Sequence, residues 1–163
     1  MGTIHIRRIS IEDVSACHRI ERICFEPDEA ASLHKIQARQ RIFADGFLVA
    51  LEEDSVVGFI NSAATNQPDL SDEAIKDLIG HEADGSTMVI LSLAVDPPHQ
   101  GKGISSRLMR SFIEQWRSSR KTSICLLCKE HLIGFYAKFG FVDRGRSDSE
   151  HGGSRWHEMA LRI

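Results

Sequence analysis

A hydrophobic segment that runs into a glycine-containing loop is the part of this sequence best suited to chemistry. The segment ends at residues 93–95, two prolines follow at 97 and 98, and Gly101-Lys102-Gly103 precedes a helix predicted from about Ile104. The first N–H groups of a helix have no intrahelical partner and lie at the positive end of its dipole. Such a terminus suits an anion, above all a phosphate, and glycine lets the backbone approach it closely.

Two familiar phosphate loops do not fit this segment. A P-loop requires lysine and then serine or threonine after its last glycine, whereas Ile104 follows Gly103. The dinucleotide fingerprint GxGxxG requires a third glycine where this chain has Ser106. A plain turn with good helix capping therefore remains an alternative to a phosphate site.

Residues 98–103, with the sequence Pro-His-Gln-Gly-Lys-Gly, resemble the [Q/R]xxGx[G/A] motif of the Gcn5-related N-acetyltransferases, which use acetyl-CoA. The first position departs from the motif, because Pro98 replaces Gln or Arg. A second family feature, YxxxGF, is matched by residues 136–141. Residues 3–161 are also similar to the serotonin (arylalkylamine) N-acetyltransferases, notably at Leu127-Cys128, Phe135-Tyr136, Glu158-Met159 and the acidic loop after Cys24.

The resemblance implies two contacts with acetyl-CoA. The pantothenate arm would pair like an added strand with the main chain of Leu93, Ala94 and Val95. The pyrophosphate would lie over a run from the loop into the helix: His99, Gln100, Gly101, Lys102, Gly103, Ile104 and Ser105. Lys102 would add positive charge there, although a solvated lysine in a turn explains it as well.

Tyr136, the single tyrosine, is the candidate catalytic residue. Attack of a neutral amine on a thioester releases a thiolate, and a nearby acid assists its departure. The family places a tyrosine acid at this position, and an ordinary tyrosine pKa of about 10 suits proton donation. Alternatively, the ring of Tyr136 packs while its hydroxyl bonds the co-substrate passively.

No general base follows from the resemblance. Vertebrate serotonin N-acetyltransferases carry two histidines on the central strand, where this chain has Val89 and Leu91. Either solvent takes the proton or another side chain acts as the base. Each candidate base is of a type that is more often a solvated surface charge or a hydrogen-bonded structural residue: Asp28, Glu29, Asp96, His131 and His157.

The resemblance places the acceptor site at residues 25–33 and 151–156. Phe25 and Trp156 could sandwich an aryl or alkyl chain, and Glu26, Asp28 and Glu29 could attract a cationic amine. Aromatic core packing and a solvated acidic loop are the competing interpretations. We expect a small-molecule primary amine as acceptor, such as an arylalkylamine or a polyamine. The alternatives are acetylation of a protein N-terminus or lysine, and a non-catalytic acyl-CoA-binding module.

Hydrophobic periodicity predicts a mixed α/β fold in a single domain, residues 1–163, with a mixed central sheet flanked by helices. Ser10 is a candidate N-cap, with Asp13 in a box-like position. Residues 61–70 read as a polar excursion, and a short helix is expected to begin at residues 71–73. Strands are predicted at 4–9, 46–51, 56–60, 87–95, 122–128, 141–142 and 155–161, and longer helices at about 10–24, 32–44, 104–118 and 131–139.

Composition excludes several classes of protein. The 163 residues carry a net charge of −3, which does not favour nucleic-acid binding, and no apolar run is long enough to cross a membrane. Cys125 and Cys128 fall on a predicted strand, where residues three apart face opposite sides, so we expect buried thiols and no metal site. A cytoplasmic monomer or homodimer is expected.

Overall fold

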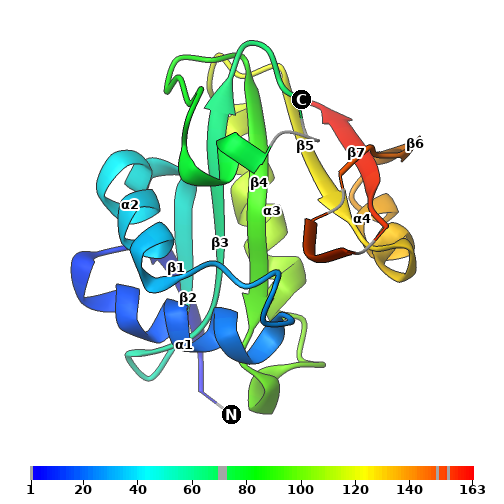
Figure 1. The fold of residues 1–163 in the computed structure, drawn as a ribbon. Helices are drawn as coiled ribbons and strands as arrows, with labels where there is room; N and C mark the ends of the chain where they lie inside the picture. Colours follow the sequence, from blue (N-terminus) through cyan, green and yellow to red (C-terminus); the bar gives the residue numbers. More distant parts are fainter. Residues whose placement is uncertain (1, 70–72, 150, 154) are drawn as a thin grey trace. The chain divides into compact units, whose positions relative to one another are not determined.

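The computed structural model describes residues 2–69, 73–149, 151–153 and 155–163. The chain divides into two compact units; Figure 1 labels the helices and strands described below. The first unit contains the chain up to Ser62 together with Ser92–Phe112, and the second contains Ala63–Leu91 and Ile113–Ile163. Two strands and one helix run through both units, and the single domain over residues 1–163 remains a prediction.

Seven strands and four α-helices are present among the described residues. Hydrogen bonding orders the strands β1-β2-β3-β4-β5-β7-β6; β4 and β5 are parallel, whereas β1–β2, β2–β3, β5–β7 and β6–β7 are antiparallel. The predicted mixed α/β fold is therefore confirmed. The strands are β1 (Ile4–Arg8), β2 (Phe47–Glu52), β3 (Ser55–Thr65), β4 (Thr87–Val95), β5 (Ser123–Cys128), β6 (Val142–Arg146) and β7 (His157–Arg162), and the helices are α1 (Val14–Cys24), α2 (Leu33–Phe43), α3 (Ile104–Arg117) and α4 (Ile133–Ala137).

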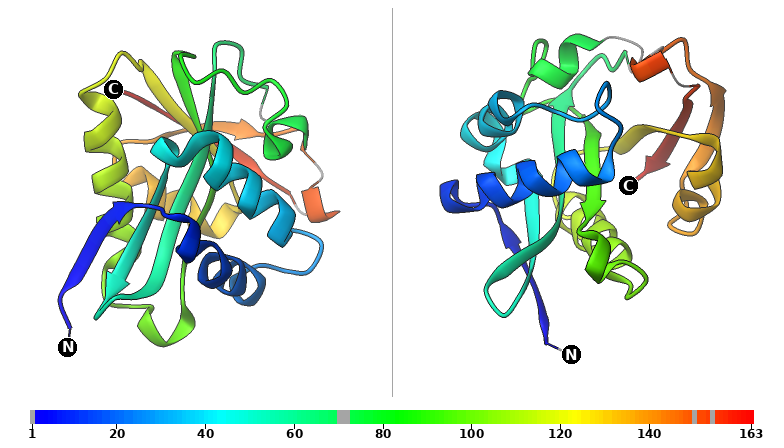
Figure 2. Two further views of the ribbon diagram at one scale, coloured as in Figure 1. Left: turned by 90° about the vertical axis from the view of Figure 1, so that its left-hand side faces the viewer. Right: turned by 60° about the horizontal axis from the view of Figure 1, so that its bottom comes forward.

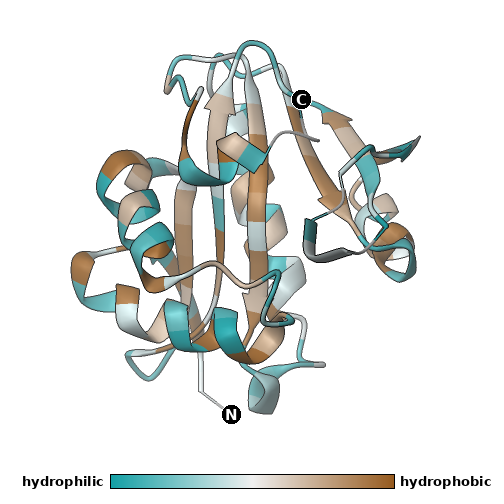
Figure 3. Cartoon of the chain, viewed as in Figure 1, coloured by the Kyte–Doolittle hydropathy of each residue, from teal (hydrophilic) through white to brown (hydrophobic). Residues whose placement is uncertain are grey.

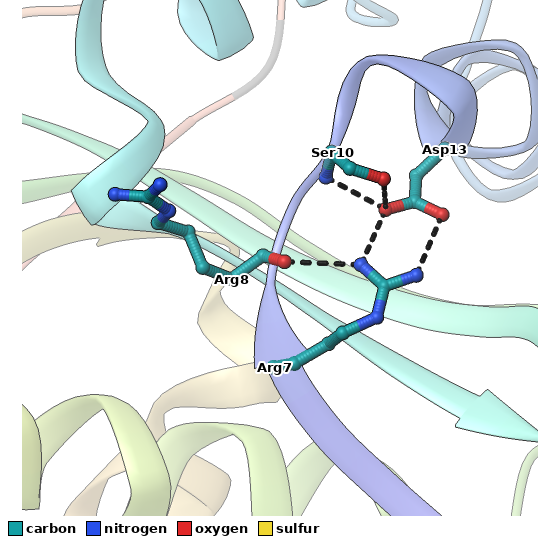
Figure 4. A network of polar contacts seen from close by, with 4 residues as sticks. All are labelled: Arg7, Arg8, Ser10 and Asp13. Atoms are coloured by element: carbon teal, nitrogen blue, oxygen red, sulfur yellow. Dashed lines mark hydrogen bonds and ion pairs between the residues drawn. The ribbon is translucent and has the colours of Figure 1, made fainter.

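The entry into α1 is fixed by one carboxylate (Figure 4). Oδ2 of Asp13 accepts hydrogen bonds from the Ser10 amide at 2.8 Å and the Ser10 hydroxyl at 3.0 Å. The Arg7 guanidinium donates to both carboxylate oxygens, at 2.7 and 3.1 Å. Burial opposes ionisation of Asp13, but these hydrogen bonds outweigh it and hold its pKa below the usual value. The predicted box-like role of Asp13 is confirmed.

In the first unit, α1 and α2 lie on one face of the strands and the first turns of α3 lie on the other (Figure 2). Helical spacing over residues 10–24 predicts one apolar stripe that begins at Ile11, and Val14, Cys17 and Ile20 of that stripe are buried in α1. Ile11 is 71% exposed, because residues 11–13 form a 3₁₀ turn with a different period. Helical spacing over residues 32–44 predicts that Leu33, Ile36 and Phe43 face inward; Ile36 and Phe43 are buried, but Leu33 is exposed, so for Leu33 the prediction is wrong and the inward face of α2 begins one turn later, at Ile36.

β3 is longer than its hydropathy predicts. The strand continues to Thr65, so residues 61–65 are not a polar excursion. Asn61 and Ser62 are buried, and the Ser62 hydroxyl donates to the Gly46 carbonyl at 2.8 Å. Polar side chains that find partners inside a sheet leave no hydrophobic signal in the sequence. Leu70, Ser71 and Asp72, which end the excursion and begin the expected short helix, lie outside the described residues; a 3₁₀ turn, Glu73–Asp77, is present.

In the second unit, the first half of β4 pairs with β5, and α4 packs against β6 and β7. β4 is coloured largely as hydrophobic along its length (Figure 3), consistent with its mostly buried residues. Cys125 and Cys128 are free and buried, as expected, and burial raises their pKa values to about 12 and about 11. None of the described helices is long and apolar enough to span a membrane.

Candidate active site

The last residues of β4 present an edge of main chain in the first unit. The Asp96 amide donates to the Val57 carbonyl of β3 at 2.8 Å. The Ala94 carbonyl oxygen lies 3.0 Å from the position that a Cβ atom on Gly58 would take, so it also faces β3. Because main-chain groups alternate along a strand, those of Leu93 and Val95 face the opposite edge. An added strand can therefore pair with Leu93 and Val95, but not with Ala94.

Within the described residues, the parallel register of β4 and β5 runs from Thr87↔Ser123 to Ile90↔Leu126. The residues of β4 beyond Ile90 are not held by that register. Leu93 is half-buried, and Ala94 and Val95 are buried. The end of β4 thus offers backbone donors and acceptors that are not committed to the parallel pairing.

The Val95 carbonyl oxygen accepts two side-chain hydrogen bonds. Nε2 of Gln100 donates at 2.9 Å, and Sγ of Cys24 donates at 3.2 Å from the end of α1. Burial, assisted by Asp96, raises the pKa of the Cys24 thiol. Cys24 therefore stays protonated near neutral pH and acts as a donor.

The loop of residues 98–103, called the glycine loop below, leads directly into α3. Gly101 and Gly103 have φ values of +78° and +80°, and a Cβ atom on either would meet nothing within 4 Å. The conformation favours glycine, while the space above both residues is open. Gly101, Lys102 and Gly103 are exposed.

The N-terminus of α3 follows the glycine loop without a break. The Arg107 amide donates to the Gly103 carbonyl at 3.1 Å, which is the first bond of the helix. The amides of Ile104 and Ser105 precede it and belong to the unpaired first turn. The strand end, the glycine loop and this helix terminus all lie in the first unit, so the predicted co-substrate residues are brought together there.

Two side-chain contacts tie the loop region to neighbouring elements, and neither has a local sequence signal. Nε2 of His99 lies 2.9 Å from Oε2 of Glu52, at the end of β2. Asp96 is buried and lies 3.1 Å from the Arg19 guanidinium. Both partners are remote in sequence, which is why sequence reasoning missed Glu52 and Arg19.

Two buried charged residues, Arg39 of α2 and Glu21 of α1, were also not predicted from the sequence. Arg39 of α2 is 3% exposed and donates to Asn61 at 3.4 Å and to Ser92 at 3.5 Å. Glu21 of α1 is 2% exposed and accepts from the Ala31 amide at 2.9 Å. Charged residues of amphipathic helices are normally assigned to the surface, so the burial of Arg39 and Glu21 is seen only in the structure.

Tyr136 lies on α4 in the second unit and is buried. The Phe135 and Phe141 rings contact it edge-on, with centroids 5.0 and 5.9 Å away. Burial, with a further contribution from Cys128, raises the pKa of Tyr136 well above its ordinary value. The hydroxyl is therefore protonated at neutral pH, and none of the described residues forms a hydrogen bond with it.

Val89 and Leu91, the positions at which the vertebrate serotonin N-acetyltransferases carry histidines, lie in apolar surroundings. Val89 packs with Cys125, and Leu91, Leu127 and Ala160 cover the pair. Among the alternative bases, Asp96 is held by Arg19, and Nδ1 of His157 lies 3.2 Å from Asp143. Asp28 and His131 are exposed, and Glu29 is half-buried.

The two aromatic residues predicted for the acceptor lie in different units. Phe25 is half-buried at the end of α1 and packs against the core of the first unit. Trp156 is half-buried in the second unit, where its Nε1 donates to the His151 carbonyl at 2.9 Å. The Lys129 ammonium lies 5.7 Å from the centre of the Trp156 ring. Ser154, within the predicted segment 151–156, is outside the described residues.

A strand edge that continues through a glycine loop into a helix N-terminus is the arrangement expected of a protein that binds a phosphate-bearing ligand with an extended arm. The family model described as "Acetyltransferase (GNAT) family" matches residues 14–141, and the chain belongs to this family. Membership confirms the predicted superfamily and the expected co-substrate, acetyl-CoA.

Comparison with known proteins gives a curated relative and many solved structures. The chain is 28% identical over 97 residues to glucosamine 6-phosphate N-acetyltransferase 1 of rice, a match over 60% of this chain and 59% of that protein. The loading GNATL domain of CurA from Lyngbya majuscula superposes with a TM-score of 0.87 at 16% identity, over 99% of this chain and 98% of that one. Ard1 from Thermoplasma volcanium superposes with a TM-score of 0.78 at 24% identity, over 98% of this chain and 97% of that one. These two structures show a shared fold.

Proposed function

We propose that the protein is an acetyl-CoA-dependent N-acetyltransferase acting on the primary amine of a small molecule, of the arylalkylamine or polyamine type. The observation that carries the proposal is the continuous arrangement, in the first unit, of the β4 edge, the glycine loop and the N-terminus of α3. Membership in an acetyltransferase family supports the reaction class. The similarity of residues 3–161 to the serotonin N-acetyltransferases supports this kind of acceptor.

The chain's residues fit acetyl-CoA on one direct criterion. The glycine loop holds two residues with positive φ and open space above them, so backbone amides can approach a diphosphate without obstruction. Leu93 and Val95 would pair with the pantetheine arm. His99 to Ser105 would surround the pyrophosphate, with Lys102 adding positive charge. The co-substrate supplies the activated acetyl thioester.

Tyr136 is proposed as the acid. A bond forms between the amine nitrogen and the acetyl carbon, the carbon–sulfur bond breaks, and the thiolate takes a proton from the Tyr136 hydroxyl. The raised pKa of Tyr136 keeps the hydroxyl protonated at neutral pH, but it also makes this tyrosine a weaker acid than an exposed one, so the transfer requires the thiolate to form beside the hydroxyl. The amine gives up its own proton to solvent, since Val89 and Leu91 provide no titratable group, and solvent returns a proton to Tyr136 after coenzyme A has formed.

For the acceptor we propose Phe25 and Trp156 as apolar contacts, with the acidic loop after Phe25 attracting the cationic form of the amine. Glu26 and Asp28 of that loop are exposed, which suits long-range attraction. We also propose a cytoplasmic monomer or homodimer. The four free cysteines accord with a reducing compartment.

The test is a panel of acceptors offered to the purified protein with acetyl-CoA, with release of free thiol as the readout. Arylalkylamines and polyamines are expected to release thiol, while peptides with a free N-terminus or lysine release little. Preference for the peptides would replace the small-molecule acceptor by a protein acceptor. Binding of acetyl-CoA with no thiol release from any acceptor would leave only the non-catalytic module.

A further inference from the structure

The Val95 carbonyl oxygen is already saturated with hydrogen bonds. A carbonyl has two lone pairs, and Val95 uses them for Gln100 at 2.9 Å and Cys24 at 3.2 Å. The first distance is that of a full amide hydrogen bond. A third donor can approach this oxygen only if one of the two leaves.

Val95 is also one of the two residues whose main chain faces the edge where an added strand would pair. Asp96 and Ala94 face β3, and Val95 between them faces away from it. The Gln100 side chain therefore presents to this edge the same chemical group, an amide N–H, that a pairing peptide-like arm would present. Gln100 comes from the glycine loop, four residues beyond the strand's flanking Asp96.

Of the two donors, Gln100 is the one that can leave at low cost. Its side chain belongs to an exposed loop residue and can transfer its hydrogen bonds to water. Cys24 is half-buried at the end of α1, next to Phe25, and both pack against the core of the first unit. A thiol confined there has fewer alternative positions.

We propose that Gln100 is a positioning residue that holds the Val95 carbonyl as a substitute for the pantetheine amide and is exchanged for it when acetyl-CoA binds. This inference rests on the proposed function, because it requires pantetheine to pair with Val95. As a consequence, only ligands that carry the pantetheine arm lose affinity by having to displace Gln100. A ligand that contacts the loop and the helix terminus, but lacks that arm, leaves the bond between Gln100 and Val95 intact.

The experiment measures how one substitution changes the affinity of the protein for each of two ligands. Gln100→Met keeps the length of the side chain and removes its donor. We expect this variant to bind acetyl-CoA about 3- to 10-fold more tightly than the wild type, the worth of one net hydrogen bond no longer displaced. Its affinity for 3′-phosphoadenosine 5′-diphosphate, the nucleotide half of the coenzyme, should change less, because that ligand would meet the backbone amides of the loop while the Gln100 side chain stays on Val95; the ratio of the two affinities is therefore the readout. Both affinities are measured by isothermal titration calorimetry.

Gln37→Met is the matched control, since Gln37 is an exposed glutamine of α2; it should alter neither affinity. Gln100→Glu is the second variant: its carboxylate cannot donate to Val95, and because its charge repels the diphosphate that both ligands share, we expect both to bind more weakly while the ratio of affinities still shifts toward acetyl-CoA. Equal weakening of both ligands in the two Gln100 variants would make Gln100 a structural part of the loop and overturn the exchange. An unchanged affinity of Gln100→Met for acetyl-CoA would overturn it too. A wild-type protein that binds neither ligand would instead overturn the proposed function, and the exchange with it.

Discussion

Replacing Gly103 by alanine and by glutamate separates backbone strain from charge at the glycine loop. Gly103 has φ +80°, and a Cβ atom there would meet nothing within 4 Å. Alanine therefore adds strain without a clash. Glutamate adds the same strain and places a carboxylate where we propose the pyrophosphate.

The strain at position 103 should lower the free energy of unfolding of the alanine variant by about 1 kcal/mol. A left-handed conformation costs an L-residue about 1–2 kcal/mol, and the loss of glycine's freedom in the unfolded chain offsets about 0.4–1 kcal/mol of it. Gly134→Ala is the matched control, because Gly134 lies in α4, has open space around its Cβ and has no positive φ. That substitution should stabilise the protein by about 0.5–1 kcal/mol. Urea unfolding should thus show opposite signs for the two alanine variants.

The charge affects binding of acetyl-CoA rather than folding. Two like charges about 4 Å apart repel by about 1 kcal/mol in water and about 4 kcal/mol near a protein surface. A middle value of about 2 kcal/mol predicts that Gly103→Glu binds acetyl-CoA about 30-fold more weakly than Gly103→Ala at low salt. The difference should shrink as ionic strength rises, because exposed charges are screened.

Calorimetric titration of both variants at about 0.05 M and about 0.5 M salt provides the assay. Equal affinities of the alanine and glutamate variants for acetyl-CoA at low salt would refute the placement of the pyrophosphate over the glycine loop. A 30-fold difference that did not respond to salt would refute its electrostatic origin.

Two further predictions concern Tyr136 and Asp13. Tyr136→Phe should lower kcat about 100-fold while leaving the Kd for acetyl-CoA unchanged, because only the proton donor is lost; an unchanged kcat would remove Tyr136 from the reaction. Asp13→Asn should cost about 2 kcal/mol at pH 7, since charged hydrogen bonds from Arg7 and Ser10 are weakened. The pKa of Asp13 is lowered by folding, so its stabilisation is present above the unfolded value of about 3.9 and is lost as pH falls through the folded value. Urea unfolding at pH 7, 5 and 3 should show the gap between wild type and variant closing in acid, and a constant gap would contradict the assignment.

The elements that were predicted correctly from the sequence are those whose hydrophobic residues follow a regular, uninterrupted spacing. Helical spacing over residues 104–118 predicts an apolar side of α3, and each of its residues is buried: Leu108, Met109, Phe112, Ile113 and Trp116. β4 has the predicted bounds, because a nearly continuous apolar run is typical of a central strand. The box at Ser10 and Asp13 was predictable because its residues are only three apart.

The parts that sequence missed depend on partners far along the chain. β3 extends to Thr65 because buried polar residues find partners, such as Ser62 with Gly46, that a hydropathy pattern does not contain. At the candidate site, glycine spacing identified the loop, but the bond from Gln100 to Val95 and the pair of His99 with Glu52 required coordinates. Tyr136 was found through a motif, whereas its burial and raised pKa follow from its packing against Phe135 and Phe141.

The central claim is that this chain transfers the acetyl group of acetyl-CoA to an amine. Mass spectrometry of the acceptor after incubation with protein and isotopically labelled acetyl-CoA tests it most directly, with Gly103→Glu as the matched variant of reduced co-substrate affinity. We expect a labelled N-acetylated small amine, formed in amounts equal to the coenzyme A released and strongly reduced with the variant at low concentrations of acetyl-CoA. Release of coenzyme A with the label recovered only as acetate, and no labelled acceptor, would contradict the claim.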